Sequence, residues 1–466
     1  MDDTLHGDSS AIPARIDRLP VSREIWRIIL LAGIAWLLES YDIGVVGTIL
    51  PSLKRQFDLS TSMIALLAVV STIGIVVAVF PAGWLADRFG RKKVLLVGTI
   101  WYALFSFACA FAPNPTMIVV LRFISGFGMG AIFPIPYAMA AEFTPSSLRG
   151  TATGILDAFL SVGYFAAPLL GFAFAALLPA QQSWRILLMI GGIPILFAPI
   201  LYKWMPESPR WLQSRGRAKE ADQIVNYLET AVEKRTGTTL PYPQSEEQTV
   251  TESATPPSTL FSHAYLKRTL MMWVAFACIL FIFYVIQTYT PTLLVSQGYA
   301  LGNAFLMTTI IVIASIPGKF AAAYALERWG RKPTLIGFTL IAALAAIIFG
   351  LVHNAILATL FGAIMSFFGI GVDPAIKIYG AEQYPTRIRA MGISAFEGVG
   401  RLFGGVLAPY IMAFSLASGG TFGSYVFVAA IACCGVIAVA FFGNETRGQS
   451  LEKASASQTV STRTAA

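Results

Sequence analysis

Long apolar runs alternate with short polar segments along almost the whole chain. Each run holds about twenty or more residues, which is the length that a helix needs to cross a bilayer. A long polar insert separates the runs into two groups of six, near 26–50, 62–86, 94–112, 115–140, 149–178 and 184–204, and near 269–296, 303–326, 333–352, 355–380, 387–416 and 421–443. This pattern predicts an all-α integral membrane protein with twelve transmembrane helices.

The polar segments suggest where the domains begin and end. We expect a cytosolic N-terminal tail, an N-terminal six-helix bundle, a cytosolic loop, a C-terminal six-helix bundle and a cytosolic C-terminal tail, over residues 1–25, 26–204, 205–268, 269–443 and 444–466.

The loop itself has two parts. Residues 216–235 carry apolar side chains at helical spacing and predict an amphipathic helix. Residues 236–259 are rich in Thr, Ser, Pro and Glu and read as a flexible linker.

Composition supports the membrane and excludes other classes. The chain is 56% hydrophobic and 12% charged, whereas soluble domains have about 25% charged residues. A disordered chain is therefore excluded, and the composition disfavours a water-soluble enzyme. The net charge of +8 could indicate nucleic acid, but outside the spans only Lys54, Arg55 and Arg185 are basic residues on the side opposite the N-terminus. This is the positive-inside rule, which predicts cytosolic termini and the lipid bilayer, not nucleic acid, as partner.

The two groups of runs contain an internal repeat. Residues 83–92 read GWLADRFGRK and residues 323–332 read AYALERWGRK, an offset of 240. At the same offset, EFTPSSLRG at 142–150 matches EQYPTRIRA at 382–390. The chain is therefore predicted to consist of two parallel six-helix repeats. Repeats related by an axis along the membrane normal predict a substrate site between the halves and transport by alternating access.

The motifs also resemble a known family. GWLADRFGRKK at 83–93 is similar to the signature loop of the major facilitator superfamily, and PESPRWL at 206–212 and NETRGQSLE at 444–452 resemble its sugar-porter branch. The resemblance implies the major facilitator fold. Two positions depart from the family pattern, because Ala323 replaces a signature glycine and Asn444 replaces a usual proline.

Charged residues of these motifs predict a gate on the cytosolic side. Asp87 lies at the C-terminal end of a helix, whose dipole disfavours an anion, so we expect it to meet an arginine or another helix N-terminus. The alternative is that the basic residues only anchor topology. The predicted gate residues are Asp87, Arg88, Arg91, Glu142, Arg149, Glu207 and Arg210 in the first half, and Glu327, Arg331, Glu382, Arg389, Glu397, Glu445 and Arg447 in the second.

Ionisable residues inside spans are costly and usually functional or paired. Glu39 and Asp42 are three residues apart and share a helix face. Asp42 lies about 12 Å, and Arg122 about 10 Å, below the outer ends of their helices. Equal depth makes a pair feasible. We interpret Asp42, Glu39 and Arg122 as a proton-coupling group, with a permanent structural ion pair as the alternative.

A second group of polar residues suits a substrate. Arg401 lies near the middle of its span, where a guanidinium would bind a carboxylate, or would instead pair with Glu397 one turn away. Lys319, Asp373, Lys377 and Asp157 are expected to pair nearer the inner gate. Aromatic and polar side chains before Pro291 are either further substrate ligands or simple packing, and these are Tyr284, Gln287, Tyr289 and Thr290.

The predicted function is that of a transporter, without enzymatic activity, cofactor or metal. The stretch RIDRLPVSREIWRIILLAGIAWLLESYDIG most resembles bacterial metabolite–proton symporters related to synaptic vesicle glycoproteins, which include nicotinate transporters. This implies proton-coupled import of nicotinate or a similar small aromatic carboxylate, by a monomer in a bacterial inner membrane. A sugar or polyol porter is the alternative, and a non-transporting membrane sensor is a third possibility.

Overall fold

The computed structural model describes residues 12–20, 22–145, 148–237, 239–241, 257–384 and 386–447, and these form helices without any strand. In the first half the helices are α1 (Ile12–Asp17), α2 (Arg23–Phe57), α3 (Thr61–Phe89), α4 (Arg91–Cys109), α5 (Pro115–Ile132), α6 (Ile135–Phe143), α7 (Arg149–Leu177), α8 (Ala180–Ile190), α9 (Ile193–Trp204), α10 (Pro209–Ser214) and α11 (Ala218–Thr236). In the second half they are η3 (Pro257–Phe261), α12 (Leu266–Tyr284), η4 (Val285–Tyr289), α13 (Thr290–Ser296), α14 (Leu301–Ile313), α15 (Ser315–Trp329), α16 (Arg331–Leu351), α17 (Ala355–Gly369), α18 (Asp373–Glu382), α19 (Thr386–Gly400), η5 (Arg401–Leu407) and α20 (Ala408–Phe442).

Eleven helical stretches within the described residues are long and apolar enough to cross a membrane. The last, Met391–Phe442, has 52 residues, about twice the length that one crossing needs. Inside it Gly420 has φ 62° and ψ −166°, a backbone conformation that breaks the helix. Counted as two crossings, this stretch brings the described spans to twelve, as the sequence pattern predicts.

Several spans consist of two shorter helices because a proline interrupts them. Pro134 separates α5 from α6, and Pro374, 240 residues later, is the second residue of α18. Proline lacks the N–H that would continue the ladder, and neighbouring helices satisfy the freed carbonyls. The breaks therefore repeat between the two halves.

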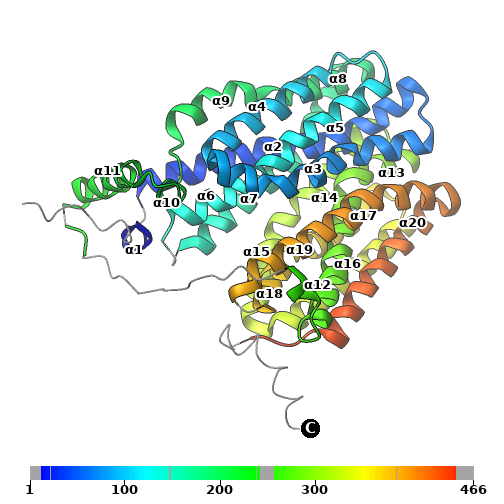
Figure 1. Ribbon diagram of the computed structural model, residues 1–466. Coiled ribbons are helices and arrows are strands. Elements are labelled where there is room, and N and C mark those ends of the chain that lie inside the picture. Colours follow the sequence, from blue (N-terminus) through cyan, green and yellow to red (C-terminus); the bar gives the residue numbers. More distant parts are fainter. Residues whose placement is uncertain are drawn as a thin grey trace, which may run out of the picture. The chain divides into compact units, whose positions relative to one another are not determined.

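The chain packs as two compact units, each with its own apolar core. Unit 1 consists of Met1–Ile43, Gly74–Gly163 and Arg185–Val250, and unit 2 of Gly44–Ile73, Tyr164–Trp184 and Thr251–Ala466. The two units are defined by packing, whereas the bundles expected at 26–204 and 269–443 are defined by the sequence repeat. The boundaries of the units therefore do not test the expected boundaries of the bundles. In unit 2, α16 packs along α20 and α17 (Figure 1).

A small helical cluster outside the spans belongs to unit 1. Helices α1 and α10 pack on α11 through an apolar cluster of Ile12, Ile16, Trp211, Leu212, Ala221 and Val225 (Figure 1). Arg15 of α1 pairs with Glu229 of α11 at 2.6 Å and with Asp222 at 3.1 Å. Helix α11 occupies the segment whose periodicity predicts an amphipathic helix. Most of the expected linker, 242–256, and the tail from 448 onward lie outside the described residues.

Two spans of unit 2 contain π-helical segments. Segment η4 lies between α12 and α13, and η5 lies between α19 and α20, beginning at Arg401. A π-helical turn adds one residue to the helical turn and is frequently found at functional sites. Both segments coincide with the candidate substrate residues of the sequence.

Candidate functional site

An ion pair is fully buried within the spans of unit 1. Asp42 of α2 and Arg122 of α5 are 0% and 1% exposed, and Nη1 of Arg122 lies 2.8 Å from Oδ2 of Asp42. Nη2 of Arg122 donates to the backbone carbonyl of Asp42 at 2.7 Å. Ser106 of α4 donates its hydroxyl to Oδ1 of Asp42 and accepts from Nη1 of Arg122 at 3.2 Å. Three spans therefore meet at one carboxylate.

Small residues and local hydrogen bonds allow this approach. Gly191 lies in the break between α8 and α9, where an added Cβ would be 2.6 Å from Oγ of Ser106 and 2.7 Å from Oδ1 of Asp42. Tyr41 donates its hydroxyl to the carbonyl of Leu187 in α8 at 2.8 Å. Because Gly191 has no side chain, a fourth span, formed by α8 and α9, can also approach the carboxylate of Asp42. Sequence reasoning identified Asp42 and Arg122 but missed Ser106 and Gly191, since neither is ionisable.

Glu39 lies one turn before Asp42 on α2 and is 1% exposed. It is near enough to Tyr102 of α4 for its charge to act on the phenol. The two acids of α2 therefore lie in the same part of unit 1.

Arg401 belongs to a second polar cluster, within unit 2. Its Nη2 is 3.2 Å from Oε2 of Glu397, one turn earlier. Nζ of Lys377 lies 3.8 Å from Oε1 of Glu397 and 2.9 Å from Oδ2 of Asp373. Acids and bases alternate along this chain of contacts. The internal pairing of Arg401 with Glu397 that the sequence left open is present.

Aromatic rings surround the Arg401 end of this cluster. The hydroxyls of Tyr284 and Tyr164 lie near enough to interact with its charge. Phe283 bridges them, because its ring centroid is 5.2 Å from that of Tyr164 and 5.3 Å from that of Tyr284. Gly405 of η5 lets Tyr284 approach, since an added Cβ would be 2.9 Å from its ring. Sequence reasoning missed Tyr164 and Phe283.

The other three candidates from this span take different positions. Gln287 and Tyr289 lie in η4, and the backbone of Gln287 faces Gly47, whose added Cβ would be 2.5 Å from the Gln287 carbonyl. Thr290 is fully buried and donates to the carbonyl of Val285 at 3.5 Å. Within the described contacts, Tyr284 alone of the four lies beside Arg401.

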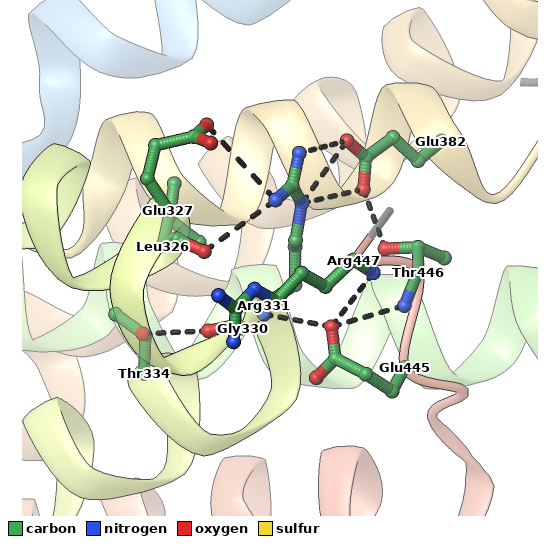
Figure 2. Close-up of polar contacts among 9 residues, drawn as sticks. All are labelled: Leu326, Glu327, Gly330, Arg331, Thr334, Glu382, Glu445, Thr446 and Arg447. Carbon is green, nitrogen blue, oxygen red and sulfur yellow. Dashed lines mark hydrogen bonds and ion pairs between the residues drawn. The ribbon is translucent and has the colours of Figure 1, made fainter. Parts of the chain in front are cut away.

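The second copy of the gate motif forms a compact lattice in unit 2 (Figure 2). Arg331, the first residue of α16, directs its guanidinium to Glu382, with Nη2 2.9 Å from Oε1, and lies 4.0 Å from Glu327. Glu445 accepts the backbone N–H groups of Arg331 and Lys332, each at 2.9 Å, and so caps α16. Thr446 donates to Glu382 at 2.5 Å.

Gly330 makes this cap possible. Its φ of 104° is favourable only for glycine, and an added Cβ would lie 2.9 Å from Glu445. Although partial desolvation acts to raise the pKa of Glu445, the backbone N–H groups of Arg331, Arg447, Lys332 and Thr446 hold it below its ordinary value. The carboxylate therefore stays ionised at neutral pH.

The first copy repeats this arrangement in unit 1. Arg91 lies 2.9 Å from Asp87 and 3.4 Å from Glu142, and Glu207 accepts the N–H of Lys92 at 3.1 Å. The backbone carbonyl of Asp87 accepts from Nε1 of Trp211 at 2.6 Å and from Arg215, also at 2.6 Å. Glu207 and Glu445 thus hold equivalent places in the two halves.

The remaining charged candidates lie outside these two lattices as described. The exposed Arg88 stacks on the ring of Trp84 at 5.1 Å, and Arg210 lies in α10. The side chains of Arg149 and Arg389 fall outside the part that the structure describes. Asp157, the counterpart of Glu397 in the repeat, accepts from the hydroxyl of Tyr137 at 2.5 Å. Lys319 lies in α15.

Known proteins match this chain over nearly its whole length. The family model described as "Sugar (and other) transporter" matches residues 28–457. The niacin transporter NiaP of Acinetobacter baylyi is 32% identical over 94% of this chain and 98% of its own. The 4-hydroxybenzoate transporter PcaK of Pseudomonas putida is 30% identical over 89% of this chain and 92% of its own.

A solved structure gives the same fold. The inward-open xylose transporter XylE from E. coli superposes with a TM-score of 0.74 over 93% of this chain and 99% of its own, at 20% identity. At that identity the likeness concerns the fold alone, which is the major facilitator fold expected from the sequence.

Proposed function

We propose that this chain imports a small aromatic carboxylate such as nicotinate together with protons. The chain belongs to the sugar (and other) transporter family and is a membrane transporter, not an enzyme. The observation that carries the substrate class is the position of Arg401 near Tyr164 and Tyr284, whose rings both pack against Phe283. A guanidinium binds a carboxylate through two parallel hydrogen bonds, and aromatic rings stack on a flat ligand.

The relatives support this class of substrate. Niacin and 4-hydroxybenzoate, which name two of them, are both single aromatic rings with one carboxylate. The substrate carboxylate would replace Glu397 as partner of Arg401. Tyr284 and Phe283 would then contact its ring.

Proton coupling is assigned to the buried carboxylate of unit 1. With Asp42 ionised, Arg122 holds α2 and α5 together through the ion pair and the backbone carbonyl. A proton on Asp42 removes that charge pairing and leaves the guanidinium with neutral acceptors. The packing of four spans around one carboxylate would therefore respond to a proton, which is the two-state element that coupling needs.

We further propose that the protein lies in a bacterial inner membrane with both termini in the cytosol. The distribution of Lys and Arg supports this orientation, since most of these residues lie on the side of the membrane where the two termini are expected. The gate lattices of Figure 2 and its first-half counterpart would then lie on the cytosolic side.

Uptake into proteoliposomes tests the proposal. Labelled nicotinate, 4-hydroxybenzoate and xylose are offered with and without an inward proton gradient. We expect uptake of the aromatic acids, accelerated by the gradient, and a loss of about 100-fold in their apparent affinity in Arg401→Ala. Arg217→Ala, which removes an exposed arginine of unit 1, serves as the matched control.

The outcomes separate the alternatives. Xylose uptake without aromatic acid uptake would support a sugar porter, which the family description also covers. Binding without any flux would contradict transport. Equal uptake with and without the gradient, or unchanged coupling in Asp42→Asn, would contradict the assignment of the proton to Asp42.

A further inference from the structure

A basic cavity of about 310 Å³ lies in unit 1, beside the first copy of the gate lattice, and Asp42 is not among its lining residues. Four segments form its wall, the start of α2, the start of α4, the end of α9 and one face of α11. Its polar and aromatic lining consists of Arg27, Lys92, Lys203, Gln223, Trp204 and Tyr227.

The lining is cationic and contains no carboxylate. Nε of Arg27 is buried and has no hydrogen-bond partner among the described residues. Nζ of Lys92 lies over the ring of Tyr202 at 5.3 Å and Nζ of Lys203 lies 6.0 Å from the ring of Trp204, and within the described residues neither is within 4.0 Å of an acid. Glu207 accepts the backbone N–H of Lys92, caps α4 and acts on the charge of the Lys92 ammonium. Three positive charges therefore line a cavity whose own lining holds no carboxylate.

The cavity lies at the level where a membrane meets water. Arg27, Lys92 and Lys203 are within five residues of the ends of their spans, Arg23–Phe57, Arg91–Cys109 and Gln181–Trp204. Exposed aromatic rings surround the mouth, with Tyr202 68%, Trp204 48% and Tyr227 53% exposed. Tryptophan and tyrosine concentrate at this depth because their rings are amphipathic. Below them the surface of the spans is apolar.

We propose that this cavity binds the phosphate headgroup of an anionic glycerophospholipid, with the acyl chains lying along the exposed ends of α4 and α9. Arg27 and Lys92 contact the singly charged phosphate, and Lys203 donates hydrogen bonds to the hydroxyl oxygens of the headgroup. Basic pockets between spans at the membrane surface are typical sites for anionic headgroups. Because α11 supplies Gln223 and Tyr227, the lipid also holds α11 against the spans.

Native mass spectrometry of the full chain in detergent tests this site. The protein is mixed with phosphatidylglycerol, phosphatidylethanolamine or phosphatidylcholine, and the lipid-bound fraction is measured for each. We expect phosphatidylglycerol to bind, and Lys92→Gln/Lys203→Gln to weaken that binding about tenfold or more. The single variant Lys203→Gln, at an exposed position, keeps the test valid if the double variant folds poorly, and should weaken binding about threefold.

The matched control is Lys219→Gln/Lys234→Gln, which removes two exposed lysines of α11 that do not line the cavity. Equal losses in both double variants would show general charge attraction and overturn the site. Equal binding of phosphatidylcholine would also overturn it. Glycerol 3-phosphate and inorganic phosphate form the last arm. If either displaced phosphatidylglycerol at equal concentration, the site would belong to a soluble phosphate and the lipid assignment would be wrong.

Discussion

Oε2 of Glu397 lies 3.2 Å from Nη2 of Arg401, one turn apart in the same span. Any other carboxylate that binds Arg401 must therefore compete with the carboxylate of Glu397, which the same span holds beside the guanidinium. Lys377, 3.8 Å from the other oxygen of Glu397, offers that acid a second partner when it is displaced. Under the proposed function, a substrate bound at Arg401 would rearrange the ion pairs between α18, α19 and η5.

Removal of this competitor should tighten substrate binding. In Glu397→Gln the guanidinium keeps its position but loses its anionic partner, so a substrate carboxylate gains the whole interaction. We expect the dissociation constant of nicotinate to fall about three- to tenfold, measured by equilibrium binding to the purified protein. Asp373→Asn is the control, because Asp373 pairs with Lys377 and not with Arg401. An unchanged dissociation constant in Glu397→Gln would remove the competition.

The buried pair of unit 1 should show strong non-additivity. Arg122→Gln leaves Asp42 charged and fully buried, and breaking a buried pair from one side costs about 3–5 kcal/mol. Arg122→Gln/Asp42→Asn removes both charges and should recover much of that loss. Thermal unfolding in detergent measures the order, with the double variant unfolding at a higher temperature than Arg122→Gln. If the stability losses of the single variants Arg122→Gln and Asp42→Asn simply added in the double variant, the two residues would have no energetic coupling.

The fold was largely predictable because its signals are long and repeated. Twelve apolar runs predict the spans, an offset of 240 residues predicts the parallel halves, and equal depth in the membrane made a pair of Asp42 with Arg122 feasible. These inferences rest on the repeat, the rise of a helix and the thickness of a bilayer.

The surroundings of the sites were less predictable because they depend on packing. Ser106 and Gly191 are ordinary small residues, and their contribution to the site depends on how the spans pack around Asp42. Tyr164 comes from the first half of the sequence but packs in unit 2 beside Phe283. The sequence grouped Gln287, Tyr289 and Thr290 with Tyr284 by their depth in the span, and the π-helical segment η4 shifts the side chains after Tyr284 away from the positions of a regular helix.

Gly191 should be intolerant of a single methyl group. In Gly191→Ala the new Cβ would meet Ser106 at 2.6 Å and Asp42 at 2.7 Å, and overpacking of this kind costs about 1–3 kcal/mol. We expect a lower unfolding temperature and weaker proton coupling. Gly154→Ala in α7 is the control, since nothing lies within 4 Å of its added Cβ and alanine favours the helix by about 1 kcal/mol. Equal stability of the two variants would contradict the close approach.

The cap formed by Glu445 should depend on pH in a definite direction. Its folded pKa lies below the ordinary value of 4.5, so the ionised carboxylate stabilises the fold above that pH, and the stabilisation is lost as the pH falls through the folded pKa. Glu445→Gln keeps an acceptor but loses the charge at the N-terminus of α16, at a cost of about 0.5–1 kcal/mol. Unfolding temperatures should therefore differ between the two proteins at pH 7 and converge only as the pH falls below 4.5 and through the folded pKa. Glu327→Gln, whose side chain is 79% exposed, should match the unsubstituted protein at both pH values. A difference for Glu445→Gln that grew toward low pH would have the opposite sign and would contradict the cap.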